Sequence, residues 1–289
     1  MAGAFTISPA LRCGTVALIV ADLGRALRYY EQRIGLQIRR QESGAAWLGA
    51  GGEDLLHLIE QRGVRPVQRG RTGLYHFAIL TPARSDLGRT LQHLIATETP
   101  IDGASDHRVS EALYLSDPDG HGIEIYRDRP RREWPFVKGS LGMTTDPLDA
   151  RGLMAADRSK TPWEGIDPAT VMGHVHLHVA DLAAAEHFYV DLLGMDLMQH
   201  FGGQAGFVSA GGYHHHLGLN TWAGVGAPPS PADAARLLSF ELIVPDAANL
   251  GALVEQLRAG GVAVSATEDA WNALDPSSNR AILRGSQSE

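Results

Sequence analysis

Three side chains of types that bind transition metals are candidates for a metal site, namely His76, Glu124 and His174. Two imidazoles and one carboxylate leave coordination positions open, which suits Fe(II) that must also bind a substrate and O2. A lone histidine or glutamate on a strand is more often a hydrogen-bonded or solvent-facing residue than a ligand. The metal-site hypothesis therefore depends on whether the fold brings the three together.

A second group is the run Tyr213-His214-His215-His216. On a strand, alternation puts His214 and His216 on one face and His215 on the other. An imidazole, whose ordinary pKa is about 6.5, suits proton transfer at neutral pH. Such a run is also typical of a metal-scavenging surface tract. The pattern alone assigns no role to His214 or His215.

The elements that must position these residues repeat along the chain. Residues 14–35 and 173–194 both contain alternating apolar residues, then Val-Ala-Asp-Leu, and then a helical stretch that ends in glycine. This pattern predicts a strand that leads into a helix. Two N-caps and two left-handed glycines at the helix ends are expected: Asp22, Asp181, Gly35 and Gly194.

Two fainter copies begin near residues 74 and 237, and each ends in an Asp-Pro turn that predicts a β-hairpin. The chain therefore contains four modules, each with a strand, a helix and then several strands. They cover about 12–62, 72–128, 171–224 and 235–285. Residues 129–170, which are rich in Pro, Arg, Trp and Gly, are expected to form a linker between modules 2 and 3. The expected division is an N-terminal domain, a linker and a C-terminal domain: 1–128, 129–170 and 171–289.

Equivalent positions of the four modules differ in their capacity to bind a metal. At the first-strand position the modules carry Thr15, His76, His174 and Ser239. At the last-strand position the alignment places Leu56, Glu124, His216 and Ile282. Only modules 2 and 3 supply metal-binding side chains, so we expect these two to pair around a metal and modules 1 and 4 to pair as a structural unit.

Composition and charge exclude several classes of function. The 289 residues carry a net charge of −8, which argues against nucleic acid or an anionic membrane as partner. No apolar run approaches the roughly 20 residues that span a bilayer, and residues 1–14 lack the pattern of a secretory signal. Cys13 is the only cysteine, so an internal disulfide is excluded. We expect a cytoplasmic protein.

The βαβββ repeat resembles the vicinal oxygen chelate superfamily, which includes extradiol dioxygenases, glyoxalase I and bleomycin-resistance proteins. The resemblance covers nearly the whole chain. It implies an α+β fold in which four βαβββ modules form two cupped mixed sheets, with one divalent metal held between two paired modules. The fold alone does not choose among the functions of this superfamily.

A local motif narrows the choice. Residues 107–124, HRVSEALYLSDPDGHGIE, resemble the extradiol ring-cleavage dioxygenase motif around its glutamate ligand. Ser105 departs from the motif, because the family has Gly, Asn, Thr, Ile or Val there. The resemblance implies a metal site and three residues that act on the substrate. The implied ligands are His76, Glu124 and His174; Tyr114 and His107 would hydrogen-bond the substrate, and His216 would be the general acid/base.

The resemblance implies an oxidoreductase, a non-haem iron extradiol dioxygenase of the catechol 2,3-dioxygenase-like type. Such an enzyme uses Fe(II), with Mn(II) as the alternative metal. Its partners are O2 and a small aromatic diol, a catechol whose ring opens to a hydroxymuconic semialdehyde in aromatic hydrocarbon catabolism. The module with Glu124 precedes the module with His174, an order similar to that of a subgroup of bacterial catechol 2,3-dioxygenase-like proteins.

Two alternatives within the same fold are a metal-dependent glyoxalase I-like isomerase and a non-enzymatic drug-binding protein. Glyoxalase I-like sites usually use four protein ligands, often with two glutamates, and here only Glu124 is present. Bleomycin-resistance folds lack the ligand triad. Trp163, Phe207 and Trp222 are candidates for either a substrate pocket or the core. The sequence leaves homo-oligomer formation open.

Overall fold

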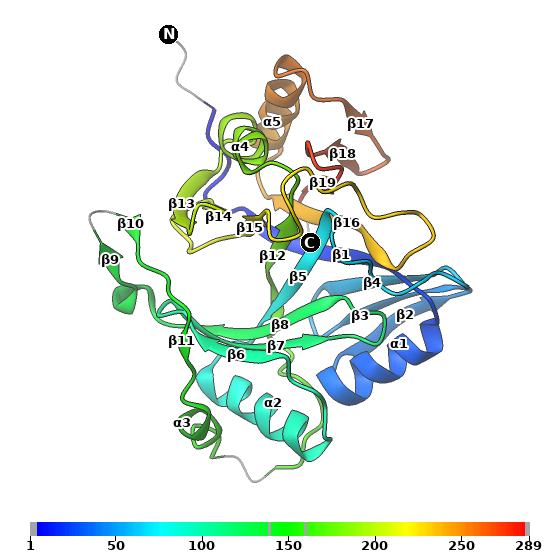
Figure 1. Cartoon of the computed structure of the whole chain (residues 1–289), viewed down its shortest axis with the longest axis vertical. Coiled ribbons are helices and arrows are strands. Elements are labelled where there is room, and N and C mark those ends of the chain that lie inside the picture. Colours follow the sequence, from blue (N-terminus) through cyan, green and yellow to red (C-terminus); the bar gives the residue numbers. More distant parts are fainter. Residues whose placement is uncertain (1–4, 138–139, 159–160, 287–289) are drawn as a thin grey trace.

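Two curved sheets with helices packed on them make up the molecule (Figure 1). The computed structural model describes residues 5–137, 140–158 and 161–286. Within these residues, modules 1 and 4 form one sheet and modules 2 and 3 form the other. The predicted α+β fold and the predicted module pairing are therefore confirmed.

The sheet of modules 1 and 4 has the described strand order β17-β18-β19-β16-β1-β4-β3-β2. Its central strands β1 and β16 are antiparallel, and each pairs in parallel with the last strand of its own module. The strands are β1 (Arg12–Val20), β2 (Gln37–Glu42), β3 (Ala45–Gly49), β4 (Asp54–Glu60), β16 (Arg236–Val244), β17 (Val264–Ala266), β18 (Ala270–Leu274) and β19 (Arg280–Gly285).

The sheet of modules 2 and 3 has the described order β11-β6-β7-β8-β5-β12-β15-β14-β13. Its central strands β5 and β12 are antiparallel, so the first strands of the two modules lie side by side. The strands are β5 (Gly73–Leu80), β6 (Gly103–Asp106), β7 (Ser110–Ser116), β8 (Gly122–Asp128), β11 (Asp146–Pro147), β12 (Val171–His178), β13 (Asp196–Phe201), β14 (Ala205–Ser209) and β15 (Leu217–Asn220). A separate ribbon pairs β9 (Phe136–Val137) with β10 (Ser140–Leu141).

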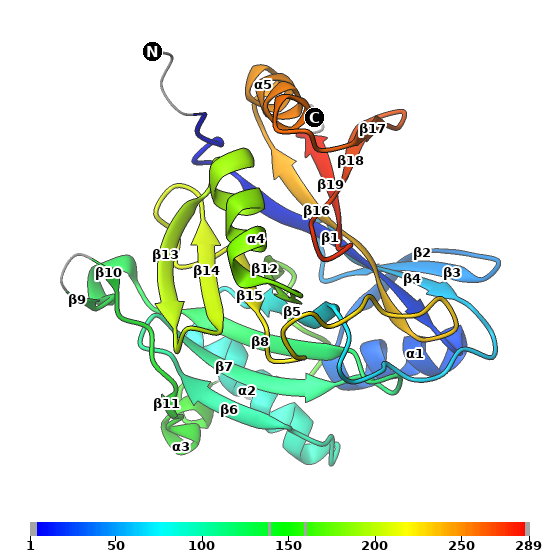
Figure 2. The same ribbon diagram turned by 45° about the horizontal axis from the view of Figure 1, so that its top comes forward.

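The helices pack on the sheets. Helix α2 lies beneath β6, β7 and β8, whereas α5 lies beside β16 and β19 at the opposite end of the molecule (Figure 2). The α-helices are α1 (Leu23–Tyr29), α2 (Arg84–Ala96), α3 (Ala150–Met154), α4 (Leu182–Glu186) and α5 (Ala247–Ala259). A 3₁₀ turn, η2 (Arg131–Glu133), and two π-helical turns, η1 (Tyr30–Ile34) and η3 (His187–Leu192), complete the described helical segments.

The predicted helix ends are confirmed. The carboxylate of Asp22 accepts a hydrogen bond from the backbone N–H of Arg25, and Asp181 caps α4 in the same way. Gly35 and Gly194 follow the helical segments with φ of 85° and 76°, a region in which a Cβ atom is strained. The sequence pattern did not predict the π-helical turns before these glycines.

One tyrosine in each π-helical turn donates a hydrogen bond to the aspartate of an Asp-Pro hairpin. The Tyr30 hydroxyl donates to Oδ2 of Asp117 at 2.9 Å, and the Tyr189 hydroxyl donates to Oδ2 of Asp275 at 3.0 Å. Asp117 lies between β7 and β8, and Asp275 lies between β18 and β19, so both predicted hairpins are confirmed. Burial opposes ionisation of Asp117, but contact with His121 outweighs it, and the pKa of Asp117 is lowered.

Tyr30→Phe is expected to lower the free energy of unfolding by about 1–3 kcal/mol, because a buried carboxylate loses one of its donors. The matched control is Tyr29→Phe, since the Tyr29 hydroxyl is buried without a hydrogen-bond partner among the described residues. That variant should keep or slightly raise stability. Urea unfolding of both variants measures the difference, and equal losses would contradict the role given to the Tyr30–Asp117 bond.

The segment 129–170 is not only a connection between modules 2 and 3. Within its described part, β11 pairs with β6, and α3 packs against α2. The division into 1–128 and 171–289 stays a proposal about chain order, because each sheet takes one module from each side. Among the described helices, none combines the length and apolar character needed to cross a membrane. Residues 1–4 belong to the N-terminal segment in which the sequence shows no pattern of a secretory signal. They lie outside the described residues.

Candidate metal centre

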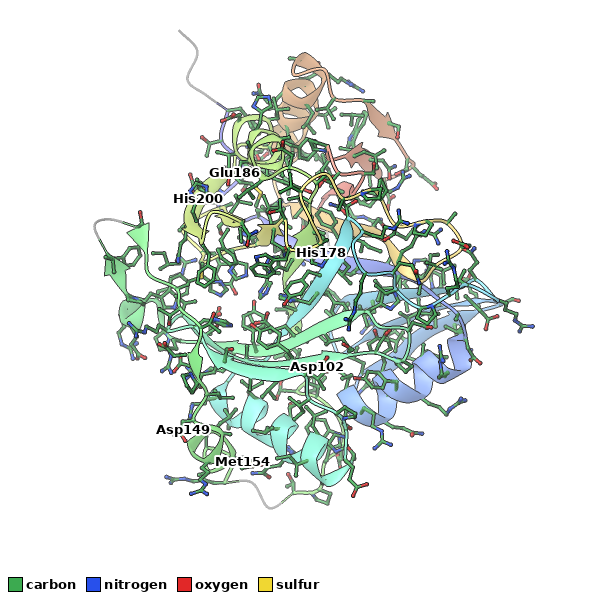
Figure 3. All side chains as sticks on the ribbon, viewed as in Figure 1. Asp102, Asp149, Met154, His178, Glu186 and His200 are labelled. Atoms are coloured by element: carbon green, nitrogen blue, oxygen red, sulfur yellow. The ribbon has the colours of Figure 1, made fainter. Side chains whose placement is uncertain are left out.

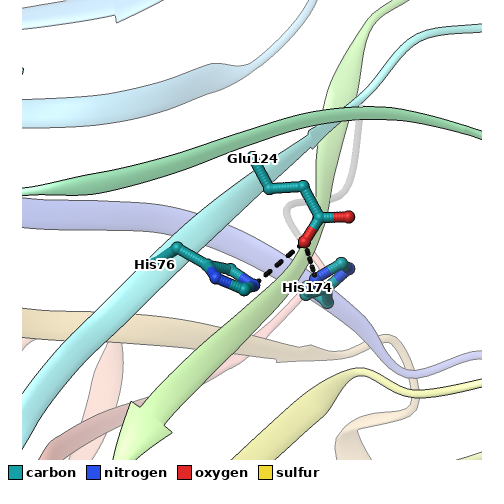
Figure 4. A group of neighbouring side chains, drawn as sticks. All are labelled: His76, Glu124 and His174. Atoms are coloured by element: carbon teal, nitrogen blue, oxygen red, sulfur yellow. Dashed lines mark hydrogen bonds and ion pairs between the residues drawn. The ribbon is translucent and has the colours of Figure 1, made fainter. Parts of the chain in front are cut away.

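His76, Glu124 and His174 point toward one another from the sheet formed by modules 2 and 3 (Figure 4). They come from β5, β8 and β12, three adjacent strands in the order β8-β5-β12. Oε2 of Glu124 lies 3.0 Å from Nε2 of His76 and 3.2 Å from Nε2 of His174. One ligand atom from each residue lies within 4.8 Å of the others, and all three residues are buried.

The polar atoms of this triad fit a divalent cation better than they fit one another. Nε2 of His76 has no hydrogen-bond partner with acceptable geometry, although it lies close to the Glu124 carboxylate. Burial lowers the pKa of His76, which keeps its imidazole neutral as a metal ligand must be. Burial opposes ionisation of Glu124, but both imidazoles outweigh it and hold the pKa of Glu124 well below its usual value. His76 and Glu124 are thus in their metal-binding forms at neutral pH.

The strand registers correct the alignment of the last strands. In module 2, Glu124 pairs with the residue two positions after His76. The same rule identifies His57 in module 1, Gly218 in module 3 and Ile282 in module 4. The placement of Leu56 and His216 at this position was therefore wrong, whereas Glu124 and Ile282 are confirmed there. Gly218 offers no ligand, and a Cβ atom there would lie 2.7 Å from the His176 ring.

The histidine run lies in the loop before β15 and not in the strand itself. His215 lines the cavity next to the triad, and its ring centroid lies 4.1 Å from that of His174. His216 does not line that cavity; its Nδ1 accepts from the backbone N–H of Ala210 and contacts the Ser209 hydroxyl. The structure therefore places His215, rather than His216, where a proton could be exchanged with a ligand.

Tyr114 and His107 form a hydrogen-bonded pair on the other side of the triad. Nδ1 of His107 donates to the backbone carbonyl of Thr144 at 2.6 Å, because a carbonyl can only accept. In neutral His107 the remaining nitrogen, Nε2, then accepts from the Tyr114 hydroxyl at 2.6 Å. Tyr114 is the cross-strand neighbour of Glu124. Burial, with a smaller contribution from Glu124, raises the pKa of Tyr114 well above its usual value, so its hydroxyl keeps the proton.

A cavity of about 750 Å³ opens from the triad to the surface. Phe207 and Trp222 line it, as does His176, whereas Trp163 lies elsewhere and stacks on His93. Asp102 and His178, both labelled in Figure 3, also line this cavity. Its volume falls within the range of cavities that enclose ligands of drug size. One six-membered ring would fill only part of it.

Sequence reasoning missed three parts of the site. His176 packs beside His76, with ring centroids 4.9 Å apart, and its alternation with His174 was a usable signal. The short segment 143–145 of the linker lines the cavity, and nothing in its composition indicated this. His215 was visible in the sequence, but strand alternation cannot orient a residue in a loop.

The equivalent region of the sheet formed by modules 1 and 4 contains different side chains. His57 stacks on Trp47 with ring centroids 4.0 Å apart, and the Arg40 guanidinium lies 3.6 Å above the Trp47 ring. The side chains at the two first-strand positions are Thr15 and Ser239. Within the described ranges, the triad of modules 2 and 3 is the only group of histidine, cysteine and carboxylate side chains spaced for a metal ion.

Comparison with known proteins gives a family and a close relative. Residues 12–125 and 171–273 match the model of the glyoxalase/bleomycin resistance protein/dioxygenase superfamily. The chain is 42% identical over 275 residues to the catechol-2,3-dioxygenase of Bacillus subtilis (strain 168). That alignment covers 93% of this chain and 95% of the relative.

Solved structures with low sequence identity share the fold. A candidate dioxygenase from Bacillus subtilis has a TM-score of 0.70 at 13% identity and covers 99% of this chain and 87% of its own. Glyoxalase I from Zea mays has a TM-score of 0.57 at 17% identity, with 96% of this chain and 92% of its own covered. These two similarities concern the arrangement of the strands and helices.

Proposed function

Because the chain belongs to the glyoxalase/bleomycin resistance protein/dioxygenase superfamily, we propose that it is an extradiol dioxygenase, which opens the ring of a catechol-type diol with O2. The product would be a hydroxymuconic semialdehyde. The 42% identity to a catechol-2,3-dioxygenase over most of the chain supports this proposal. The geometry of the triad supports it independently.

The observation that carries the proposal is the composition of the metal site. Two histidines and one glutamate converge, and the position equivalent to Glu124 in module 3 holds Gly218. Three protein ligands leave adjacent positions for a bidentate diol and for O2. An isomerase of the glyoxalase I type would need a further ligand or a second carboxylate base, and a glycine supplies neither.

Fe(II) fits this donor set, with Mn(II) as the alternative. When bound, the metal would act as a Lewis acid toward both diol oxygens and would provide the redox link to O2. His76, Glu124 and His174 would hold it. The aromatic side chains of Phe207 and Trp222 would enclose the ring of the substrate and exclude water from it.

Two groups of this chain would handle protons. Nε2 of His215 would accept a proton from a diol hydroxyl, because burial and the nearby His174 keep the pKa of His215 low and its imidazole neutral. Tyr114 would hold a diol hydroxyl from the opposite side, and His107 would orient Tyr114. Tyr114 can accept a hydrogen bond at its oxygen while its own proton is shared with Nε2 of His107.

The proposal is tested by loading the protein with Fe(II) without oxygen and then adding catechol in air-saturated buffer. The expected result is a yellow ring-opened product together with consumption of one O2 per diol. Since the cavity exceeds a single ring, catechols with a larger ring substituent should be tested in parallel. No product from any diol, despite one bound iron per chain, would contradict the proposal. Isomerisation of a glutathione hemithioacetal with Ni(II) or Zn(II) would favour the isomerase instead.

A further inference from the structure

A chain of hydrogen bonds leads from the cavity wall to the end of β8. Nδ1 of His215 lies 2.7 Å from Nδ1 of His214, and Nε2 of His214 lies 2.8 Å from Oδ1 of Asp128. The side chain of His214 is completely buried, whereas 25% of the Asp128 side chain is exposed. No residue of the metal triad takes part in these hydrogen bonds.

The acceptor at one end determines where the hydrogens are. A carboxylate oxygen can only accept, so Nε2 of His214 carries a hydrogen. When His214 is neutral, its other nitrogen, Nδ1, therefore has a lone pair. Nδ1 of His215 must then donate to it. In neutral His215 this leaves Nε2 without a hydrogen, on a ring that lines the cavity.

The backbone does not determine which ring nitrogen of His215 carries the hydrogen. Residues 213–215 lie outside the strands, whereas the backbone of His216 is already hydrogen-bonded to Val175 and Val208 of the neighbouring strands. The His215 ring packs between the rings of His174 and Phe207, with centroids 4.1 Å and 4.8 Å away. Packing of this kind is compatible with either tautomer, and only the contact with His214 distinguishes the two ring nitrogens.

We propose that Asp128 and His214 are positioning residues that hold His215 in its Nδ1–H tautomer, with the lone pair of Nε2 available to a substrate hydroxyl. The inference rests on the proposed function for the identity of that hydroxyl. In the step concerned, the O–H bond of the diol breaks, a bond forms between that hydrogen and Nε2 of His215, and the electron pair stays on the diol oxygen. A free imidazole side chain prefers the opposite tautomer, whose Nε2 is occupied by a hydrogen.

The test is the tautomer of His215 in the full chain loaded with diamagnetic Zn(II). Long-range ¹H–¹⁵N spectra of the histidine-labelled protein distinguish Nδ1–H from Nε2–H, and the signal missing in His215→Gln identifies the residue. The wild type should show Nδ1–H. In Asp128→Ala, which truncates a partly exposed side chain, and in His214→Phe, which keeps a ring, the Nε2–H form should appear.

Turnover of the Fe(II)-loaded protein gives a second readout. Both variants should lose about 10- to 100-fold in kcat with KM for the diol little changed, because they touch neither the metal nor the substrate. Ser209→Ala is the matched control: it removes a contact of the neighbouring His216 and should keep both the tautomer and kcat.

An Nε2–H signal in the wild type, or an unchanged Nδ1–H signal in both variants, would overturn the inference. Wild-type kcat in both variants would overturn it as well. The spectra do not depend on turnover. A wild type with the Nδ1–H tautomer but no ring cleavage would therefore refute the proposed function while supporting the positioning role.

Discussion

Glu124→Gln is expected to lower the affinity of the protein for Fe(II) by more than about 100-fold, since changes beside a ligand already cost 10- to 100-fold. Glutamine has nearly the same size, so the packing of β8 against β5 should persist. The substitution removes the one negative charge among the three groups that converge on the site. Two imidazoles without a carboxylate bind a divalent cation weakly. We expect the fold of the variant to be unchanged.

Metal content after anaerobic dialysis and thermal unfolding with and without Fe(II) measure this effect. At a free metal concentration 100 times its Kd, the wild type should gain about 2.7 kcal/mol from binding, and Glu124→Gln should gain almost nothing. Asp102→Asn is the control, because that carboxylate lines the same cavity but hydrogen-bonds Ser116. Equal metal binding in Glu124→Gln and the wild type would remove Glu124 from the ligand set.

His215→Gln is expected to reduce kcat by about 10²- to 10⁴-fold, the usual contribution of a positioned acid/base group. Metal binding should be retained, because His215 lies beside His174 and is not one of the three converging ligands. The loss should appear in kcat more than in KM, since the missing group acts on a proton and makes little contact area.

His216→Gln is the matched comparison, one residue further along the same loop. Its ring nitrogen is already engaged by Ala210 and Ser209, so this variant should stay within a few-fold of wild-type kcat. Steady-state kinetics of the two Fe(II)-loaded variants, with iron content measured on the same samples, distinguishes them. A large loss in His216→Gln and none in His215→Gln would restore the assignment made from sequence.

The internal repeat of the sequence predicted two of the three residues of the triad. His76 and His174 occupy the same place in two copies of one module, and a local motif identified Glu124 independently. Antiparallel pairing of β5 with β12 then makes their proximity a consequence of symmetry. The structure adds that this place is buried and that Nε2 of His76 has no other partner.

The last-strand alignment failed for a different reason. Because side chains alternate along a strand, a register error of one residue moves a side chain to the other face. In module 3 the alignment was displaced by two residues, from Gly218 to His216, and it treated a loop as part of the strand. Only the pairing of His176 with Gly218 across β12 and β15 identifies the true equivalent of Glu124.

The sequence by itself determined what depends on local order: the four modules, the aspartate caps at Asp22 and Asp181, the hairpins, and two of the three triad residues by position in the repeat. The tertiary structure decided which histidine of the loop faces the cavity. In this arrangement the ring of His215 packs against that of His174, and His214 contacts Asp128, which is 86 residues away. Contacts between distant segments orient a residue in a loop, because no backbone periodicity does so there.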